Sequence, residues 1–192
     1  MFAVADCTGH GVPGAMVSVI CNSALFRSIN EYGLIEPKDI LDKTREFVIS
    51  SFEDVNDGMD ISFCSWNKKT NIIKFSGAYN PIAIIDNNEL IELKGDRQPI
   101  GKLHEFLQPF TQQEYKLQKG SQVYLYSDGY ADQFGGKGDK KFGPKKFREL
   151  LISIQGESME EQKSILNISL KKWMKESNAE QIDDVCMIGI KI

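Results

Sequence analysis

Residues 61–75 read Ile-Ser-Phe-Cys-Ser-Trp-Asn-Lys-Lys-Thr-Asn-Ile-Ile-Lys-Phe. The apolar runs 61–66 and 71–75 flank a polar Asn-Lys-Lys-Thr turn, which is the pattern of a β-hairpin. A second hairpin is predicted directly after it, because residues 81–86 and 89–93 flank Asn87-Asn88 and asparagine tolerates left-handed backbone geometry. Two consecutive hairpins predict an antiparallel sheet in the middle of the chain.

Helices are predicted on both sides of these hairpins. Pro13 suits the first turn of a helix over 13–30, and a second helix begins near Pro37. The helix over 13–30 has almost no polar face, which predicts that it is buried on several sides. After the hairpins, a helix is predicted over 144–154, and Ser158 to Glu161 form a capping box that opens another.

Further strands are predicted near both ends of the chain, at 2–5, 110–117, 122–127 and 184–192. Residues 132–143 are rich in glycine and lysine and are predicted to form a mobile loop. The order of helices, strands, helices and a last strand predicts an α+β fold in which helices cover sheet faces. No internal repeat or linker divides the 192 residues, so a single domain is expected over 1–192.

The composition excludes several classes of function. Twenty-seven acidic against 23 basic residues give a net charge of −4, which argues against a nucleic-acid partner. No apolar run approaches the length of a bilayer-spanning helix, so membrane contact is not expected. The four cysteines form no CxxC pair, which favours free thiols in a reducing compartment such as the cytoplasm. Two histidines are too few for a His-rich zinc site.

Three aspartates occupy similar positions beside predicted strands. Asp6 ends the strand 2–5, Asp128 ends the strand 122–127, and Asp183 begins the last strand. If these carboxylates converged without basic partners they would repel one another unless cations neutralised them, and oxygen ligands suit Mg²⁺ or Mn²⁺. From spacing alone the opposite interpretation also stands: each acid caps a turn.

Five segments resemble, in order, motifs of the SpoIIE-like branch of the PPM-type (type 2C) phosphatases. Residues 5–15, Ala-Asp-Cys-Thr-Gly-His-Gly-Val-Pro-Gly-Ala, are similar to its Asp-x-Ser/Thr-Gly-His-Gly segment. The other four are Ser76-Gly77-Ala78-Tyr79-Asn80-Pro81, residues 95–101, Leu125-Tyr126-Ser127-Asp128-Gly129 and Asp183-Asp184-Val185. One motif alone would be weak, whereas the ordered set covers nearly the whole chain.

The resemblance implies a fold and a set of metal ligands. The fold would be a layered α-β-β-α sandwich of antiparallel sheets that lacks its N-terminal strand or strands. Asp6 would bridge two Mn²⁺ or Mg²⁺ ions, the backbone carbonyl of Cys7 would bind one of them, and Asp128 and Asp183 would bind the other. Asp184 would not bind a metal ion itself but would support the neighbouring ligand or form the turn. His10 is interpreted as a turn residue rather than a ligand.

The resemblance also implies a reaction. A water molecule bridging the two ions would attack a phosphoserine or phosphothreonine ester in line, without a covalent phosphoenzyme. The enzyme would be a protein serine/threonine phosphatase of bacterial signalling, with a phosphorylated substrate such as an anti-anti-sigma-type protein and a sensor domain upstream in a longer parent. The sulfur of Cys7 is interpreted as a bystander, since no Arg-terminated phosphate loop follows it.

One departure from the family keeps alternatives open. Members carry a Gly-Asp-x-x-Asp element upstream of the Asp6 strand, whereas five residues precede Asp6 here. The chain is therefore expected to be N-terminally incomplete. A second hypothesis is a metal-poor binding module that docks a regulatory partner, and a third is a homodimer paired through an open sheet edge. Other charged residues are interpreted as turn or loop formers: Asp57, Asp60, Asp96 and Lys137 to Lys141.

Overall fold

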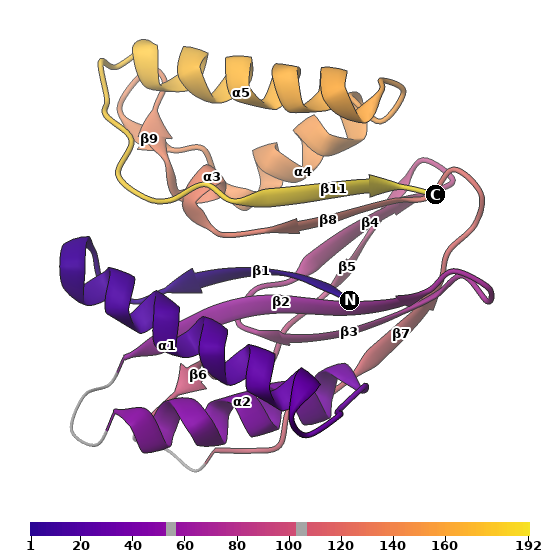
Figure 1. Cartoon of the computed structure of the whole chain (residues 1–192). Helices are drawn as coiled ribbons and strands as arrows, with labels where there is room; N and C mark the ends of the chain where they lie inside the picture. Colours follow the sequence, from indigo (N-terminus) through magenta and orange to yellow (C-terminus); the bar gives the residue numbers. More distant parts are fainter. Residues whose placement is uncertain (53–56, 103–106) are drawn as a thin grey trace. The chain divides into compact units, whose positions relative to one another are not determined.

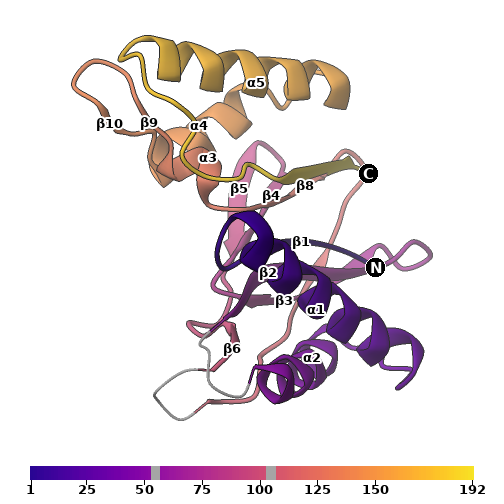
Figure 2. The ribbon, with the colours of Figure 1, turned by 60° about the vertical axis from the view of Figure 1, so that its left-hand side comes forward.

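The computed structural model describes residues 1–52, 57–102 and 107–192. The chain divides into two compact units: unit 1 comprises 1–82 and 93–117, and unit 2 comprises 83–92 and 118–192. Each unit is an antiparallel sheet with helices against one of its faces (Figures 1 and 2). The predicted α+β class is therefore confirmed.

Unit 1 contains the first hairpin. Its strands run in the order β1 (Phe2–Cys7), β2 (Gly58–Asn67), β3 (Ile72–Ala78) and β7 (Gln113–Lys116), and the short β6 (Ile100–Gly101) pairs with β2. The helices α1 (Gly11–Asn30) and α2 (Pro37–Ser51) lie side by side on one face (Figure 1). Between helices and sheet lies an apolar core that includes Ile40, Leu41 and Phe63.

Unit 2 contains the second hairpin and the C-terminal half of the chain. Its sheet has the order β11 (Met187–Lys191), β8 (Gln122–Tyr126), β4 (Ile82–Asp86) and β5 (Glu89–Leu93). Its helices are α3 (Gly129–Asp132), α4 (Pro144–Ser153) and α5 (Met159–Lys175). The aromatic rings of Tyr126 and Tyr130 both pack against the ring of Phe147, which α4 contributes to the core.

Both predicted hairpins form, but they belong to different sheets. Asn87 and Asn88 have φ values of 48° and 65°, the left-handed geometry that a tight two-residue turn requires. In the first hairpin, the Asn67 side chain accepts hydrogen bonds from the backbone of Lys69 and Thr70. The chain passes from one sheet to the other after Ala78, where Tyr79 takes a φ of 56°.

One loop differs from the sequence prediction, and the start of one helix agrees with it. Residues 132–143 are not an unstructured loop, because β9 (Phe134–Gly135) pairs with β10 (Lys140–Lys141). The capping box at Ser158 is confirmed, with the Ser158 hydroxyl accepting from the backbone N–H of Glu161. Its presence fixes the start of α5 at Met159.

The prediction that the first helix is buried on several sides is wrong. α1 buries one face only, formed by small residues such as Gly14, Cys21 and Ala24, while Val12 and Phe26 on the opposite face are exposed. The expectation that no segment could span a bilayer is also corrected, since the 20 residues of α1 are long and apolar enough by length and composition. Core helices of many proteins pass the same test.

Candidate metal centre

Asp128 lies where β8 ends and α3 begins. It is the N-cap residue of α3, and its backbone carbonyl accepts a hydrogen bond from the N–H of Asp132 over 2.9 Å. The five residues of β8 are all buried, which fixes the strand in the unit 2 core. The carboxylate of Asp128 thus projects from a rigid strand end at which the chain must turn.

Asp183 does not begin the last strand, as the sequence predicted, because β11 starts at Met187. The segment before it is nevertheless attached to the end of β8 through Ser127. The Ser127 backbone N–H donates to the carbonyl of Cys186 over 3.0 Å, and its hydroxyl accepts from the N–H of Cys186 over 3.0 Å. Because a side-chain hydroxyl here replaces one rung of the ladder, the segment carrying Asp183 is held beside the strand without being part of it.

Gly129 permits the close approach of the two segments. A Cβ at this position would lie 2.4 Å from the backbone carbonyl oxygen of Asp184 and 3.4 Å from the Cβ of Asp183. Real Cβ atoms do not come that close to a backbone oxygen, so any larger residue would force the segments apart. The glycine after Asp128 is therefore required by packing within unit 2.

The two aspartates of unit 2 form a pair of carboxylates. An oxygen of Asp128 and an oxygen of Asp183 lie within 4.8 Å of each other. The pKa of Asp128 is raised, first by its partial burial and then by the negative charge of Asp183. A site that disfavours its own negative charge in this way is chemically suited to a divalent cation with oxygen ligands.

A basic residue accompanies the two aspartates of unit 2. Lys141, on β10, donates to the carboxylate of Asp132 over 2.6 Å, and its charge partly lowers the pKa of Asp128. Sequence analysis placed Lys141 in a solvated loop. The sequence could not predict the contact between Lys141 and Asp132, which are nine residues apart, because that contact depends on the pairing of β9 with β10.

Asp6 belongs to unit 1. It lies within β1 rather than after it, and its register partner on β2 is Asp60. Neighbouring Cys7, Met59 and Ile61 pack toward the core beneath α1 and α2, so the alternation of a strand places Asp6 and Asp60 on the opposite face of the sheet. The interpretation of Asp60 as a turn residue is therefore wrong.

The thiol of Cys7 is held inside unit 1. It is hydrogen-bonded to the thiol of Cys21 and to Ser18 on α1, and the bond from Cys21 is the main reason that its pKa falls to about 7. The sulfur thus faces the helix layer. His10 is the N-cap residue of α1, but its side chain makes no capping hydrogen bond.

Two of the motif segments have structural roles within unit 1. A Cβ on Gly77 would lie 2.5 Å from the carbonyl oxygen of Asn80, and one on Gly95 would lie 2.9 Å from the same atom. These glycines allow three backbone segments to cross closely. Asp96 forms a turn, because its carbonyl accepts from the N–H of Gln98 over 2.8 Å. Its carboxylate also accepts hydrogen bonds from the backbone and hydroxyl of Thr111, so it fixes a chain crossing as well.

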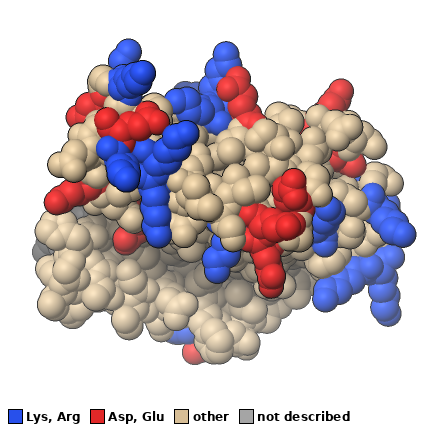
Figure 3. Space-filling model, turned by 90° about the horizontal axis from the view of Figure 1, so that it is seen from above, with Lys and Arg blue, Asp and Glu red and all other residues tan. Residues whose placement is uncertain are grey.

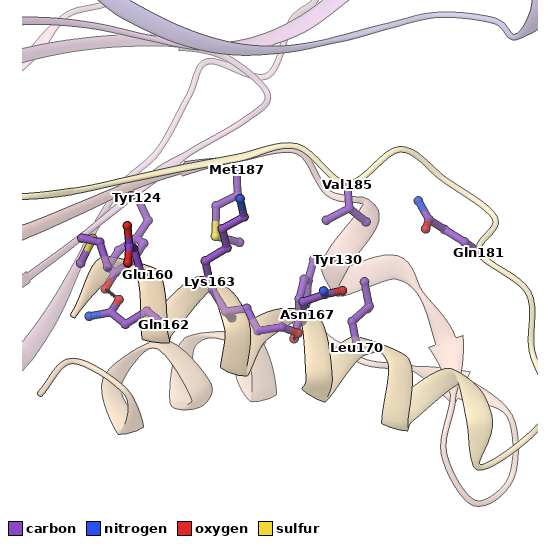
Figure 4. Close-up of a pocket in the computed structure, with 13 residues that line it drawn as sticks. Tyr124, Tyr130, Glu160, Gln162, Lys163, Asn167, Leu170, Gln181, Val185 and Met187 are labelled. Carbon is purple, nitrogen blue, oxygen red and sulfur yellow. Dashed lines mark hydrogen bonds between the residues drawn. The ribbon is translucent and has the colours of Figure 1, made fainter. Parts of the chain in front are cut away.

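Charges on the surface are mixed. The face of the molecule in Figure 3 carries Lys and Arg side chains interspersed with Asp and Glu side chains, rather than one continuous field of either sign. Unit 2 also contains a cavity of about 620 Å³ between α5 and the sheet, where Val185 and Met187 point toward Lys163 and Asn167 of the helix (Figure 4). Neither Asp128 nor Asp183 lines this cavity, so it is distinct from the acidic pair.

The family model of stage II sporulation protein E (SpoIIE) matches residues 1–192. The chain belongs to the SpoIIE family. It is thus a member of the SpoIIE-like branch of the PPM-type phosphatases, and the ordered motifs correctly predicted this. A search of curated proteins found no match.

Solved structures agree with this assignment. The SiaA-PP2C domain of Pseudomonas aeruginosa is 28% identical, with a TM-score of 0.90 over 99% of this chain and 74% of that one. The RsbU and RsbW domains of a Mycobacterium tuberculosis protein are 19% identical, with a TM-score of 0.71 over 98% of this chain and 50% of that one. The catalytic domain of the serine/threonine protein phosphatase PstP, in complex with two manganese ions, is 16% identical. Its TM-score is 0.65 over 97% of this chain and 84% of that one. The last two show similarity of fold.

Proposed function

We propose that this SpoIIE-family chain is a metal-dependent protein serine/threonine phosphatase domain. The observation that carries the proposal is the carboxylate pair of Asp128 and Asp183, which Ser127 and Gly129 hold together at the end of β8. The family match over the whole chain supports the same conclusion. Both units would then belong to one domain over 1–192.

The donor atoms suit two Mn²⁺ or Mg²⁺ ions, as in the manganese complex of PstP. Asp128 and Asp183 would hold one ion. Asp6 would bridge both, and the backbone carbonyl of Cys7 would add a ligand. When bound, the ions would supply an activated water molecule and would neutralise charge on the phosphoryl group.

The protein's own side chains contribute to orientation and charge. Ser127 holds Asp183 in place through the backbone of Asp184 and Cys186. The charge of Lys141 interacts with both Asp128 and Asp183. We assign to it the attraction of the substrate's phosphate toward the carboxylates, since a lysine side chain is a compact positive charge that recognises phosphate.

The substrate would be a phosphoserine or phosphothreonine of another protein in bacterial signalling, such as an anti-anti-sigma-type protein. Support comes from the relative in which an RsbU domain and an RsbW domain occur in one structure. The reaction would take place in the cytoplasm, under the control of a sensor domain in a longer parent protein.

Calorimetry with Mn²⁺ and phosphate release from a phosphothreonine peptide test the proposal on the 192-residue chain. We expect Asp183→Asn to abolish Mn²⁺-dependent phosphate release, whereas Asp139→Asn, a control carboxylate of the same unit, should retain it. If the chain folds but binds no Mn²⁺, the proposal of a metal-dependent phosphatase is refuted. The alternative, a metal-poor module that docks a regulatory partner, would then be favoured.

A further inference from the structure

Two cysteines of unit 1 lie in contact without being joined. Cys7 is the last residue of β1, Cys21 lies midway along α1, and their thiols are hydrogen-bonded to each other. Both are free thiols. The phosphatase proposal makes no use of either sulfur, because it assigns a role only to the backbone carbonyl of Cys7.

The contact follows from the way α1 packs on the end of β1. A short loop joins the two elements, so α1 begins beside the end of the strand (Figures 1 and 2). A Cβ on Gly14 would lie 2.7 Å from the backbone carbonyl oxygen of Gly9, so α1 lies against this loop more closely than any larger residue would permit. Gly14, Ser18 and Cys21 share one face of the helix, and Cys7 is hydrogen-bonded to Ser18 as well as to Cys21. Two rigid elements therefore hold the sulfurs together.

The two cysteines differ in their access to solvent. Cys21 is 1% exposed and belongs to the core cluster of unit 1. Cys7 packs at the border of that cluster and is partly exposed. A small oxidant therefore reaches Cys7 before Cys21. This is the arrangement of a thiol that is oxidised first beside a second thiol that resolves the product.

We propose that Cys7 and Cys21 form an oxidative modification site that takes a small hydroperoxide and reversibly joins β1 to α1. The sulfur of Cys7 attacks the O–O bond of the peroxide, keeps one oxygen as a sulfenic acid and releases the other as water or an alcohol. The sulfur of Cys21 then attacks that of Cys7, so that an S–S bond forms, the S–O bond breaks and a water molecule leaves. The two thiols are oxidised and the peroxide is reduced, and a thiol reductant reverses the link.

The other two cysteines of the chain are in different settings. Cys64, on β2, is 0% exposed, and burial raises the pKa of its thiol, so it is inert toward the oxidant. Cys186 is exposed and belongs to unit 2. An exposed thiol can react between molecules, so the tests replace Cys186 with serine.

The link should act on metal binding, a consequence that rests on the proposed function. Sulfur atoms in a hydrogen bond must come together to about 2.05 Å before they are joined, so the end of β1 has to shift toward α1. That strand end carries the Asp6 carboxylate and the Cys7 carbonyl, which are the proposed ligands from unit 1. Oxidation should therefore lower the affinity for Mn²⁺, and reduction should restore it.

Peptide mapping of the folded Cys186→Ser chain tests the disulfide. The tryptic peptide 1–27 contains Cys7 and Cys21 and no other cysteine. Brief treatment with hydrogen peroxide should close both thiols of this peptide to iodoacetamide, and dithiothreitol should reopen them. Cys21→Ala in the same background should instead leave a sulfenic acid on Cys7 that reacts with dimedone. Two thiols that stay open to iodoacetamide after peroxide would overturn the proposal.

A displaced thiol tests whether the contact itself is required. Cys21→Ala combined with Ala24→Cys moves the second thiol about 4.5 Å along the same buried face of α1, out of contact with Cys7. Peroxide should then produce no link. Equal linkage in this variant would show that nearness in the sequence is sufficient and would overturn the site.

Calorimetry with Mn²⁺ tests the consequence for the metal. The dissociation constant of the Cys186→Ser chain should rise on the order of tenfold on oxidation and return after reduction and removal of dithiothreitol. The Cys21→Ala variant, which cannot form the link, should not show this reversible change. An oxidised chain that binds Mn²⁺ as tightly as the reduced one would overturn the regulatory role. If the reduced chain binds no Mn²⁺, the phosphatase proposal fails, whereas the peptide map still decides the disulfide.

Discussion

The hydroxyl of Ser127 donates a hydrogen bond to the backbone carbonyl of Asp184 over 2.9 Å. Together with the two hydrogen bonds between Ser127 and the backbone of Cys186, this bond joins the end of β8 to the segment that carries Asp183. Ser127 is only 2% exposed, so the backbone groups that it satisfies have little access to water. The position of one proposed metal ligand therefore depends on a neighbour of the other.

Ser127→Ala should weaken the site as well as the fold. It leaves the N–H of Cys186 and the carbonyl of Asp184 without this partner, at a cost of about 1–3 kcal/mol in the free energy of unfolding. Displacement of Asp183 should also lower Mn²⁺ affinity on the order of tenfold, as loss of a supporting hydrogen bond commonly does. Urea unfolding and calorimetry measure the two effects. Ser164→Ala on α5 removes an exposed hydroxyl bond and should alter neither.

Gly129→Ala should abolish Mn²⁺ binding by unit 2. The added methyl group would lie 2.4 Å from the Asp184 carbonyl oxygen, so the segment of Asp183 must move away from Asp128. Overpacking of this kind costs about 1–3 kcal/mol. Gly156→Ala provides the matched control, because no atom lies within 4 Å of its added Cβ. If both variants bind Mn²⁺ like the wild type, the close approach is irrelevant to the site.

Asp128→Asn should have opposite effects on stability with and without metal. The burial and the charge of Asp183 that raise the pKa of Asp128 make its ionised form unfavourable in the folded protein. Neutralising it should therefore raise the melting temperature in chelator at neutral pH, while the stabilisation that Mn²⁺ gives the wild type should disappear. Scanning fluorimetry with EDTA and with Mn²⁺ measures both. A lower melting temperature in EDTA would show that the charge is favourable without metal.

Lys141→Met should impair the use of substrate more than the binding of metal. Its charge acts on Asp128 and Asp183 and is fixed by Asp132. We expect KM for a phosphothreonine peptide to rise on the order of tenfold, the equivalent of about 1.4 kcal/mol, with Mn²⁺ binding retained. Lys140→Met, one residue along β10 and therefore on the other side of the strand, should leave KM unchanged. If the two substitutions raised KM equally, the effect would come from the loss of one positive charge and not from the position of Lys141.

Glu36→Gln should reduce stability in a way that depends on pH. The carboxylate at the start of α2 accepts from Lys74 over 2.7 Å and from Gln112, and these contacts, Lys74 first, lower the pKa of Glu36. A lowered folded-state pKa stabilises the fold above the unfolded-state pKa, and this contribution is lost as pH falls through the folded value. The free energy of unfolding of the variant should thus be about 0.5 kcal/mol lower than that of the wild type at pH 7 and equal to it in strong acid. Urea unfolding at several pH values measures this stability difference, with Glu89→Gln as an exposed control. A difference between Glu36→Gln and the wild type that persists in acid would contradict the prediction.

The sequence by itself determined the local elements and the family. Alternating apolar residues placed the hairpins, Asn87-Asn88 set the tight turn, and the capping box at Ser158 fixed the start of α5, because each depends on contacts a few residues apart. The motif order led to Asp6, Cys7, Asp128 and Asp183 as candidate ligands without any structure. Their assembly into one centre remains a proposal.

Only the tertiary structure decided how distant segments meet. It showed that the two hairpins belong to different sheets, that Asp183 precedes β11 and is held by Ser127, and that Asp60 lies opposite Asp6. It also showed which face of α1 is covered. Periodicity reports that a helix is apolar but not what packs against it, since burial depends on contacts made by residues far away in the chain.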